Sequence, residues 1–262
     1  MRVHFIVDVG SNHNQNFNRA KKIIEQAAKI GAWGVKFQLY DKLFSSKKKN
    51  TDLEETKLPI EWIPGLKKIC HENGVKFGCT PFDVNSLQIL KPHVDFLKIS
   101  SSDVLRKDLI EEIVEFCQKN KMLLFASLGL FDKKASKIWS KPKFAWVNFM
   151  NCSANYPANA SQCNFSDSCF LDGWSDHTVS IPVMFAAMKR GAKWIELHID
   201  LNDKKGNEFK HGHCWTMEQF EELMMMYLEY KIALQSEYKP DKKQLLQRAD
   251  PSDGLRPMKE AR

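Results

Sequence analysis

Two lysines lie inside short apolar segments of the chain, where a charged side chain is costly to bury. Lys36 follows a valine and precedes a phenylalanine, and Lys98 lies between a leucine and an isoleucine. A lysine in such a place either meets an anionic partner or loses its proton. We therefore expect the two lysines to bind an anionic ligand. The structural alternative is a pair of internal salt bridges, for example to Asp8 or Asp103.

Two histidines end neighbouring apolar segments and could share a metal ion. His177 and His198 end the seventh and eighth predicted strands, so closure of a barrel would bring their rings to one side of its mouth. Two imidazoles, with waters and a carboxylate such as Asp176 or Glu196, leave coordination positions open for a substrate. This donor set predicts a catalytic metal site rather than a structural one.

Polar residues end the other predicted strands as well. A single polar residue at a strand end would be explained by a turn or a helix cap. Polar residues at the ends of all eight strands, which meet at one edge of the barrel, are harder to explain in this way. His211 and His213, after the eighth strand, have a spacing that could bind metal, but exposure on a loop is the favoured explanation. The strand-end residues are Asp8, Asn12 and His13; Lys36 and Gln38; Thr80 and Asp83; Lys98, Ser101 and Asp103; Ser127; Asn151; Ser175, Asp176 and His177; and Glu196 and His198.

The elements that must position these residues alternate between short apolar runs and longer helix-period segments, which is typical of βαβ units. Eight strands indicate an α/β protein with a TIM-type (β/α)8 barrel rather than an open sheet. The segment after the sixth strand, 151–170, shows no clear helix. Strands are predicted at 3–9, 33–39, 76–79, 96–99, 122–126, 145–150, 171–174 and 194–199, and helices at 18–30, 60–72, 105–119, 181–189 and 216–235.

Composition narrows the class of protein. A chain of 262 residues that is 43% hydrophobic can bury one large core, and its formal charge of +7 suits anionic small molecules better than nucleic acid. The first residues run directly into a strand pattern, without a signal peptide or a membrane-length apolar stretch, so we expect a cytoplasmic protein with no membrane partner. The seven cysteines form no CxxC pair, which argues against disulfides and structural zinc.

Seven short motifs carry a more specific signal. They are Gly-Ser-Asn-His-Asn at 10–14, Val-Lys-Phe-Gln at 35–38, Thr-Pro-Phe-Asp at 80–83, Phe-Leu-Lys-Ile-Ser-Ser-Ser-Asp at 96–103, Asn-Tyr-Pro at 155–157, Ser-Asp-His-Thr at 175–178 and Ile-Glu-Leu-His at 195–198. In this order and spacing, over roughly residues 3–235, the chain resembles the N-acetylneuraminate (sialic acid) synthases.

The resemblance implies a metal-dependent transferase that condenses phosphoenolpyruvate with the aldehyde of an N-acyl hexosamine, such as N-acetylmannosamine. The products are phosphate and a nonulosonic acid, which is a nine-carbon 2-keto acid. Asn151, at the end of the sixth strand, is counted with the substrate-binding residues. The resemblance places phosphoenolpyruvate at Lys36, Lys98, Thr80, Ser101 and Ser175; manganese, with magnesium or cobalt as alternatives, at His177 and His198; water and proton handling at Asp8 and Asp103; and the sugar at Gln38 and Tyr156.

Departures from the family pattern concern the sugar end of the site. Asp8 replaces the usual glutamate, and a Gly-Pro-Asp triplet after the eighth strand is replaced by Lys-His-Gly-His at 210–213. The sugar-binding aspartate of that triplet has no match. Leu128 stands where the family has threonine, and Asn151 where it has histidine. These changes hint at an altered sugar or a different reaction partner.

The family usually continues into a small antifreeze-like domain that crosses a dimer and contributes an arginine. We expect this chain to hold the barrel alone, in residues 1–237, followed by a linker-like tail, 238–262. Either the site is closed by a tail arginine such as Arg256 or by a separate protein, or activity is weak. A homodimer is the family expectation, which the missing domain weakens. Two other functions stay open: a Schiff-base aldolase using a strand lysine, and a barrel that has lost catalysis and binds a sugar.

Overall fold

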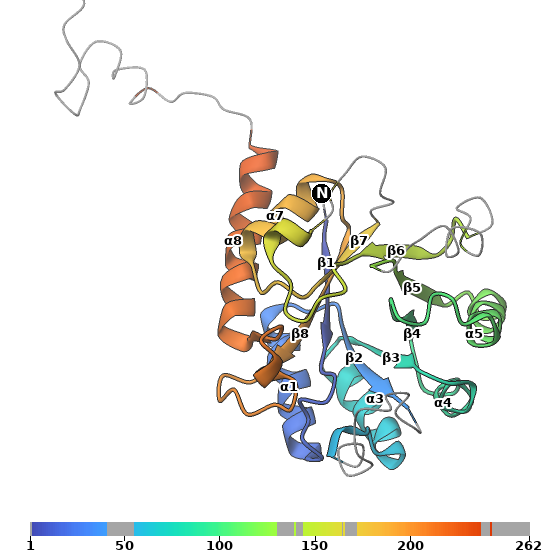
Figure 1. The fold of residues 1–262 in the computed structure, drawn as a ribbon. Helices are drawn as coiled ribbons and strands as arrows, with labels where there is room; N and C mark the ends of the chain where they lie inside the picture. The colour runs from blue at the N-terminus through green and yellow to red at the C-terminus, as the bar shows by residue number, and fades with distance from the viewer. Residues whose placement is uncertain are drawn as a thin grey trace, which may run out of the picture. The chain divides into compact units, whose positions relative to one another are not determined.

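Eight parallel strands follow one another round a closed barrel in the computed structural model (Figure 1). The structure describes residues 2–40, 55–129, 139, 144–163, 165, 172–236 and 242. The barrel closes because β1 pairs with β8 as well as with β2, which confirms the predicted TIM-type (β/α)8 architecture. The strands are β1 His4–Asp8, β2 Gly34–Leu39, β3 Lys76–Pro81, β4 Phe96–Ile99, β5 Leu123–Ser127, β6 Asn148–Asn151, β7 Gly173–Asp176 and β8 Trp194–Asp200.

Helices lie outside the strands and begin and end at recognisable signals (Figure 1). The side chain of Asn16 accepts a hydrogen bond from the backbone N–H of Arg19 and caps α1, and Gly31 ends this helix with a φ of 119°. Asp83 caps α4 in the same way. The helices are α1 Phe17–Ile30, α3 Ile63–Glu72, α4 Val84–Leu90, α5 Lys107–Lys119, α7 Ile181–Lys189 and α8 Met217–Gln235, with 3-10 turns η1 Ile60–Trp62, η2 Ala160–Gln162 and η3 Phe209–His211.

The amino-terminal end of the barrel is filled by apolar side chains. Ile6, Phe96, Phe125 and Met150 form a buried cluster against which Trp33 and Trp194 pack. Space is tight enough that a Cβ on Gly78 would lie 2.1 Å from the ring of Phe96. Since this end is closed by packing, polar side chains have room only at the carboxyl ends of the strands.

All eight predicted strands are present, with ends displaced by no more than a few residues. Among the described residues, one α-helix and one strand were not predicted: the short helix α4 and the two-residue strand β9, Trp215–Thr216, which pairs with β8. The 3-10 turns η2 and η3 were not predicted either. Between β6 and β7 the described residues contain only the turn η2, as the lack of a helix pattern indicated. The cysteines in the described part of the chain are free.

The chain divides into a compact unit, Met1–Met224, and a second unit, Met225–Arg262. Of the second unit the structure describes the remainder of α8, Ser236 and Lys242. The expected boundary after residue 237 and the tail with Arg256 lie outside the described residues, apart from Lys242, and stay predictions. Among the described helices, none is long and apolar enough to cross a lipid bilayer.

Candidate active site

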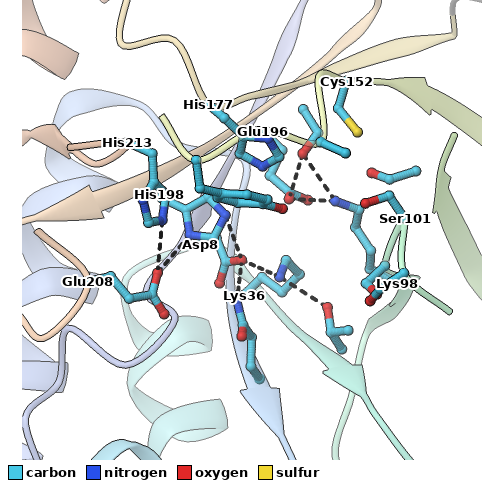
Figure 2. A pocket seen from close by; sticks show the side chains of 18 of the residues that line it. Asp8, Lys36, Lys98, Ser101, Cys152, His177, Glu196, His198, Glu208 and His213 are labelled. Atoms are coloured by element: carbon cyan, nitrogen blue, oxygen red, sulfur yellow. Dashed lines mark hydrogen bonds and ion pairs between the residues drawn. The ribbon is translucent and has the colours of Figure 1, made fainter. Parts of the chain in front are cut away.

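A pocket of about 350 Å³ opens where the strands of the barrel end (Figure 2). Every residue that the family resemblance assigns to phosphoenolpyruvate, metal, sugar or proton handling lines this pocket, apart from Asp103; Asn151, counted with the substrate-binding residues, does not line it either. The predicted residues that it brings together are Asp8, Lys36, Gln38, Thr80, Lys98, Ser101, Tyr156, Ser175, His177 and His198. Side chains from distant parts of the sequence thus meet in one cavity, as strand-end positions require.

Lys36 forms an ion pair at the base of the pocket. Its Nζ lies 2.6 Å from Oδ2 of Asp8 and 3.0 Å from Oγ1 of Thr80, and lysine and aspartate are both buried. Gln38 donates to the same Asp8 oxygen at 2.9 Å. Burial disfavours the charged lysine, but the carboxylates of Asp8 and Glu196 outweigh burial, and the pKa of Lys36 is raised. Lys36 therefore keeps its positive charge.

Lys98 forms a second buried pair on the facing side. Its Nζ lies 2.5 Å from Oε1 of Glu196, and Oγ of Ser175 lies within hydrogen-bonding distance of both groups, at 3.3 Å and 3.1 Å. Burial alone would raise the pKa of Glu196, but Lys98 and Lys36 lower it. The internal salt bridges expected as the alternative are thus present, although Lys98 pairs with Glu196 and not with Asp103. Both lysines still line the cavity, and their binding of an anionic ligand stays a prediction.

Asp103 and Asn151 lie outside the pocket lining. The Asp103 carboxylate accepts a 2.5 Å hydrogen bond from Oγ of Ser100 and lies 3.4 Å from the guanidinium of Arg106. It therefore stabilises the turn after β4. Oδ1 of Asn151 accepts from the backbone N–H of Cys152 at 3.0 Å.

His177 and His198 face each other across the end of β7 and β8, which pair as predicted, and their ring centroids are 5.5 Å apart. His177 donates through Nδ1 to the backbone oxygen of Ser153 at 2.6 Å, and His198 through Nδ1 to Glu208 at 2.9 Å. Because a carbonyl or an ionised carboxylate can only accept, both Nδ1 atoms carry the hydrogen. In the neutral rings the lone pairs are then on Nε2, which suits metal binding.

The two histidines differ in their ionisation. Burial, and then the charge of His198, lower the pKa of His177 to about 3. For His198, burial acts in the same direction, but Asp8 and Glu208 outweigh it and raise the pKa. His177 is therefore neutral over the whole physiological range, whereas its neighbours favour the protonated form of His198.

Asp176, suggested as a carboxylate ligand, does not line the pocket. Its carboxylate accepts hydrogen bonds from the indole N–H groups of Trp174 and Trp215 and from the backbone N–H of Val179, at 3.1, 2.9 and 2.9 Å. Glu196, the other suggestion, does line it. Oδ2 of Asp8 lies 3.7 Å from Nε2 of His198 and is a third candidate ligand.

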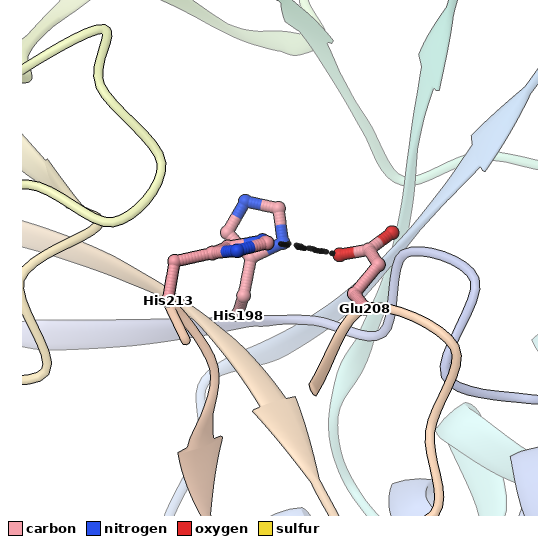
Figure 3. Close-up of side chains that lie close together, drawn as sticks. All are labelled: His198, Glu208 and His213. Carbon is pink, nitrogen blue, oxygen red and sulfur yellow. Dashed lines mark hydrogen bonds and ion pairs between the residues drawn. The ribbon is translucent and has the colours of Figure 1, made fainter. Parts of the chain in front are cut away.

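Two site residues were missed or misjudged. The explanation of His213 as an exposed loop residue is wrong: its side chain is buried and lines the pocket, and its Nε2 lies 3.5 Å from Glu208 (Figure 3). His211, by contrast, is exposed. Glu208 was not predicted at all, because neither its residue type nor its sequence neighbours set it apart. It lies on the segment after β8, close to the predicted histidines His211 and His213.

Comparison with known proteins identifies the family of the barrel. Residues 23–239 match the model of the NeuB family. An N,N'-diacetyllegionaminic acid synthase from Campylobacter jejuni is 30% identical over 75% of this chain and 67% of its own length. Its Legionella pneumophila counterpart is 26% identical over 95% of this chain and 78% of its own length. A solved sialic acid synthetase from Leptospira borgpetersenii shares the fold, with a TM-score of 0.77, 24% identity, and coverage of 97% of this chain and 93% of that one.

Proposed function

Because the chain belongs to the NeuB family, we propose that it condenses phosphoenolpyruvate with the open-chain aldehyde of an N-acyl hexosamine to give a nonulosonic acid and phosphate. The names of its relatives as legionaminic acid synthases support this reaction type. One observation carries the proposal: two buried lysines and two histidines with oriented rings line a single cavity. The lysines suit a multiply charged anion and the histidines a divalent ion.

Phosphoenolpyruvate would occupy the lysine end of the pocket. Lys36 and Lys98 offset the charge of its carboxylate and phosphate, and hydroxyl groups donate to their oxygens. The internal carboxylate partners hold both ammonium groups in place before the substrate arrives. The hydroxyl donors are Thr80, Ser101 and Ser175.

His177 and His198 would hold the divalent ion, which we propose is Mn²⁺, with Mg²⁺ or Co²⁺ as alternatives. When bound, the ion supplies Lewis acidity that polarises the aldehyde oxygen of the sugar. The two residues fit this task because each Nδ1–H is already held by an acceptor, the arrangement common to metal-binding histidines. Tyr156, whose ring centroid is 4.0 Å from that of His177, would cover the sugar beside it together with Gln38.

Asp8 would accept a proton from the attacking water. C3 of phosphoenolpyruvate bonds to the aldehyde carbon, and the aldehyde oxygen takes up a proton and becomes a hydroxyl. Water adds at C2, the bond between C2 and the phosphate oxygen breaks, and phosphate leaves, so no net proton is released. The proton lost by the water needs a nearby base, and Oδ2 of Asp8 lines the cavity between Lys36 and His198. Asp103 was expected to share this role, but its carboxylate lies outside the pocket lining, so we assign the proton to Asp8 alone.

Release of phosphate from phosphoenolpyruvate, measured with Mn²⁺ across a panel of N-acyl hexosamines, tests the proposal. We expect release that requires one of the sugars, yields a 2-keto acid with nine carbons in its backbone, and stops on chelation of the metal. Reactions without sugar are the control. Absence of sugar-dependent release across the panel, with Mn²⁺ present, would favour a barrel that only binds sugar.

A Schiff-base mechanism is disfavoured by the state of the lysines. An amine that attacks a carbonyl must be unprotonated, whereas the pKa of Lys36 is raised by its carboxylate neighbours despite burial. Borohydride with substrate should therefore trap no adduct on Lys36. Homodimerisation and a cytoplasmic location stay predictions.

A further inference from the structure

We propose that Glu208 is a positioning residue, which holds His198 in the tautomer that presents Nε2 to the pocket before any ion is bound. The inference rests on the proposed function in taking His177 and His198 as the metal ligands. Glu208 belongs to the segment after β8, where the sequence departs most from the family pattern. Its role would be to orient a ligand, not to touch the substrate.

The Glu208 carboxylate is fixed from the opposite loop. Its Oε1 accepts the backbone N–H of Ser11 at 2.7 Å and the Ser11 hydroxyl at 3.2 Å. Its own backbone N–H donates to Oδ1 of Asn12 at 2.7 Å. Only 16% of the side chain is exposed. Oε1 is therefore committed to the loop after β1, and Oε2 is left directed at His198.

The loop that carries Glu208 is itself held at several points. Asp200, at the end of β8, accepts the backbone N–H of Gly206 at 2.7 Å and pairs with Arg19 at 2.5 Å. Oδ1 of Asn14 accepts a hydrogen bond from the backbone N–H of Asn207 at 2.9 Å. Since the backbone on both sides of Glu208 is anchored, the carboxylate is in place without help from a ligand.

Oε2 of Glu208 sets the tautomer of His198. It lies 2.9 Å from Nδ1, and an ionised carboxylate has no hydrogen to donate, so Nδ1 must. The lone pair of the neutral ring is then on Nε2, on the side of Asp8. The backbone oxygen of Ser153 fixes His177 in the same way. Two unrelated acceptors thus give both rings the same tautomer.

Glu208→Gln should reverse this tautomer while preserving shape. The Ser11 N–H is an obligatory donor, so the amide oxygen of the new side chain must face it. The amide NH₂ then faces His198, whose Nδ1 can only accept, and the proton moves to Nε2. In that state Nε2 has no lone pair for an ion. Glu208→Asp keeps an acceptor-only group and should keep the Nδ1–H tautomer, with looser geometry.

Two measurements on the protein test the proposal. Long-range ¹H–¹⁵N NMR of the metal-free protein, at a pH above the raised pKa of His198, should show this ring as Nδ1–H in the wild type and in Glu208→Asp, and as Nε2–H in Glu208→Gln. Titration calorimetry with Mn²⁺ should show binding weakened about 10- to 100-fold in Glu208→Gln. The control Glu115→Gln removes an exposed charge on α5 and should match the wild type. An unchanged tautomer and affinity in Glu208→Gln would overturn the proposal.

A competing arrangement places the ion among His198, Glu208 and His213, whose donor atoms lie close enough to share one (Figure 3). The proposal expects His177→Ala to lose Mn²⁺ binding and His213→Ala to retain it, and the reverse result would overturn it. Neither readout needs phosphoenolpyruvate or sugar. If the expected tautomers and Mn²⁺ affinities were found in a protein without activity, only the proposed reaction would be refuted. If the wild type bound no Mn²⁺, the tautomers measured by NMR would decide on the role of Glu208.

Discussion

At the scale of single residues, the pocket holds its charges in two buried pairs. Lys36 with Asp8 and Lys98 with Glu196 are each almost fully buried, so neither partner can be stabilised by water. Such pairs add little net stability, but removal of one partner leaves a buried charge uncompensated. Each pair is therefore sensitive to single substitutions. The pairs also keep cations facing the cavity, where an anionic substrate needs them.

Lys98→Met should destabilise the fold through Glu196. The carboxylate loses its nearest cation, and only the hydroxyl of Ser175 remains as a hydrogen-bond partner among the described contacts to Oε1. We expect a loss of about 3–5 kcal/mol in the free energy of unfolding at pH 7. The pKa of Glu196, now lowered, should rise, so the variant should gain stability relative to the wild type as pH falls. Urea unfolding at pH 5 and pH 7 measures both effects.

The second substitution Glu196→Gln should restore part of the stability of Lys98→Met, because it removes the uncompensated charge. Lys68→Met is the matched control: Lys68 and Glu72 are 76% and 60% exposed, and an exposed pair contributes roughly 0.5 kcal/mol or less. A Lys98→Met protein as stable as the control would show that the buried pair does not act as described.

The sequence predicted the lysines and the histidine pair because each is unusual for its place in an apolar strand. Glu208 and His213 could not be found in this way, since glutamate and histidine are ordinary on a loop. Their placement depends on hydrogen bonds between the segment after β8 and the loop after β1, from residues almost two hundred positions away. Local patterns carry no information about such contacts.

At the scale of elements, the strands could be predicted because burial on both faces makes each a nearly continuous apolar run. The helices α1 and α7 were predicted almost to their ends, since glycine follows each of them closely. The helix α4 was missed because its seven residues are too few to show a helical period. Strand β9 was missed for the same reason, as two residues form no pattern.

Arg19 links two elements and should control the order of the segment after β8. From α1 it pairs with the fully buried Asp200 at 2.5 Å and with Asp203 at 2.7 Å. Arg19→Gln removes this charge, so we expect backbone amides of residues 201–214 to exchange hydrogen faster, while the strands stay protected. Hydrogen–deuterium exchange with mass spectrometry measures this.

Lys21→Gln, on the same helix, is the control for that experiment. Lys21 pairs with Glu25 at 3.7 Å on an exposed surface, where the interaction contributes little. Backbone hydrogen exchange in the Lys21→Gln variant should equal that in the wild type. Unchanged protection of residues 201–214 in Arg19→Gln would mean that the anchors from Asn12 and Asn14 hold the segment without the arginine.

At the scale of the whole molecule, the barrel buries histidines that stay neutral. Burial is the main cause that lowers the pKa of His177 to about 3 and of His13 to about 4, with Glu208 partly opposing the shift at His13. In the unfolded chain a histidine takes up a proton near pH 6.5. Between these values the unfolded state binds more protons than the folded state, so the folded state loses stability as pH falls.

His13→Phe should reduce this acid sensitivity without altering the pocket, which His13 does not line. Its ring is fully buried against Trp62, with centroids 5.8 Å apart, so phenylalanine fits the same apolar contact. Between pH 6.5 and pH 5 the free energy of unfolding of the wild type should fall by about 2 kcal/mol more than that of the variant, because each pH unit contributes about 1.4 kcal/mol. Urea unfolding at pH 5, 6, 7 and 8 measures the difference. From pH 7 to pH 8 the free energies of unfolding of the two proteins should change in parallel, because neither the folded nor the unfolded state takes up the proton of His13 there. If the two free energies stayed parallel down to pH 5, His13 would be protonated in the folded barrel.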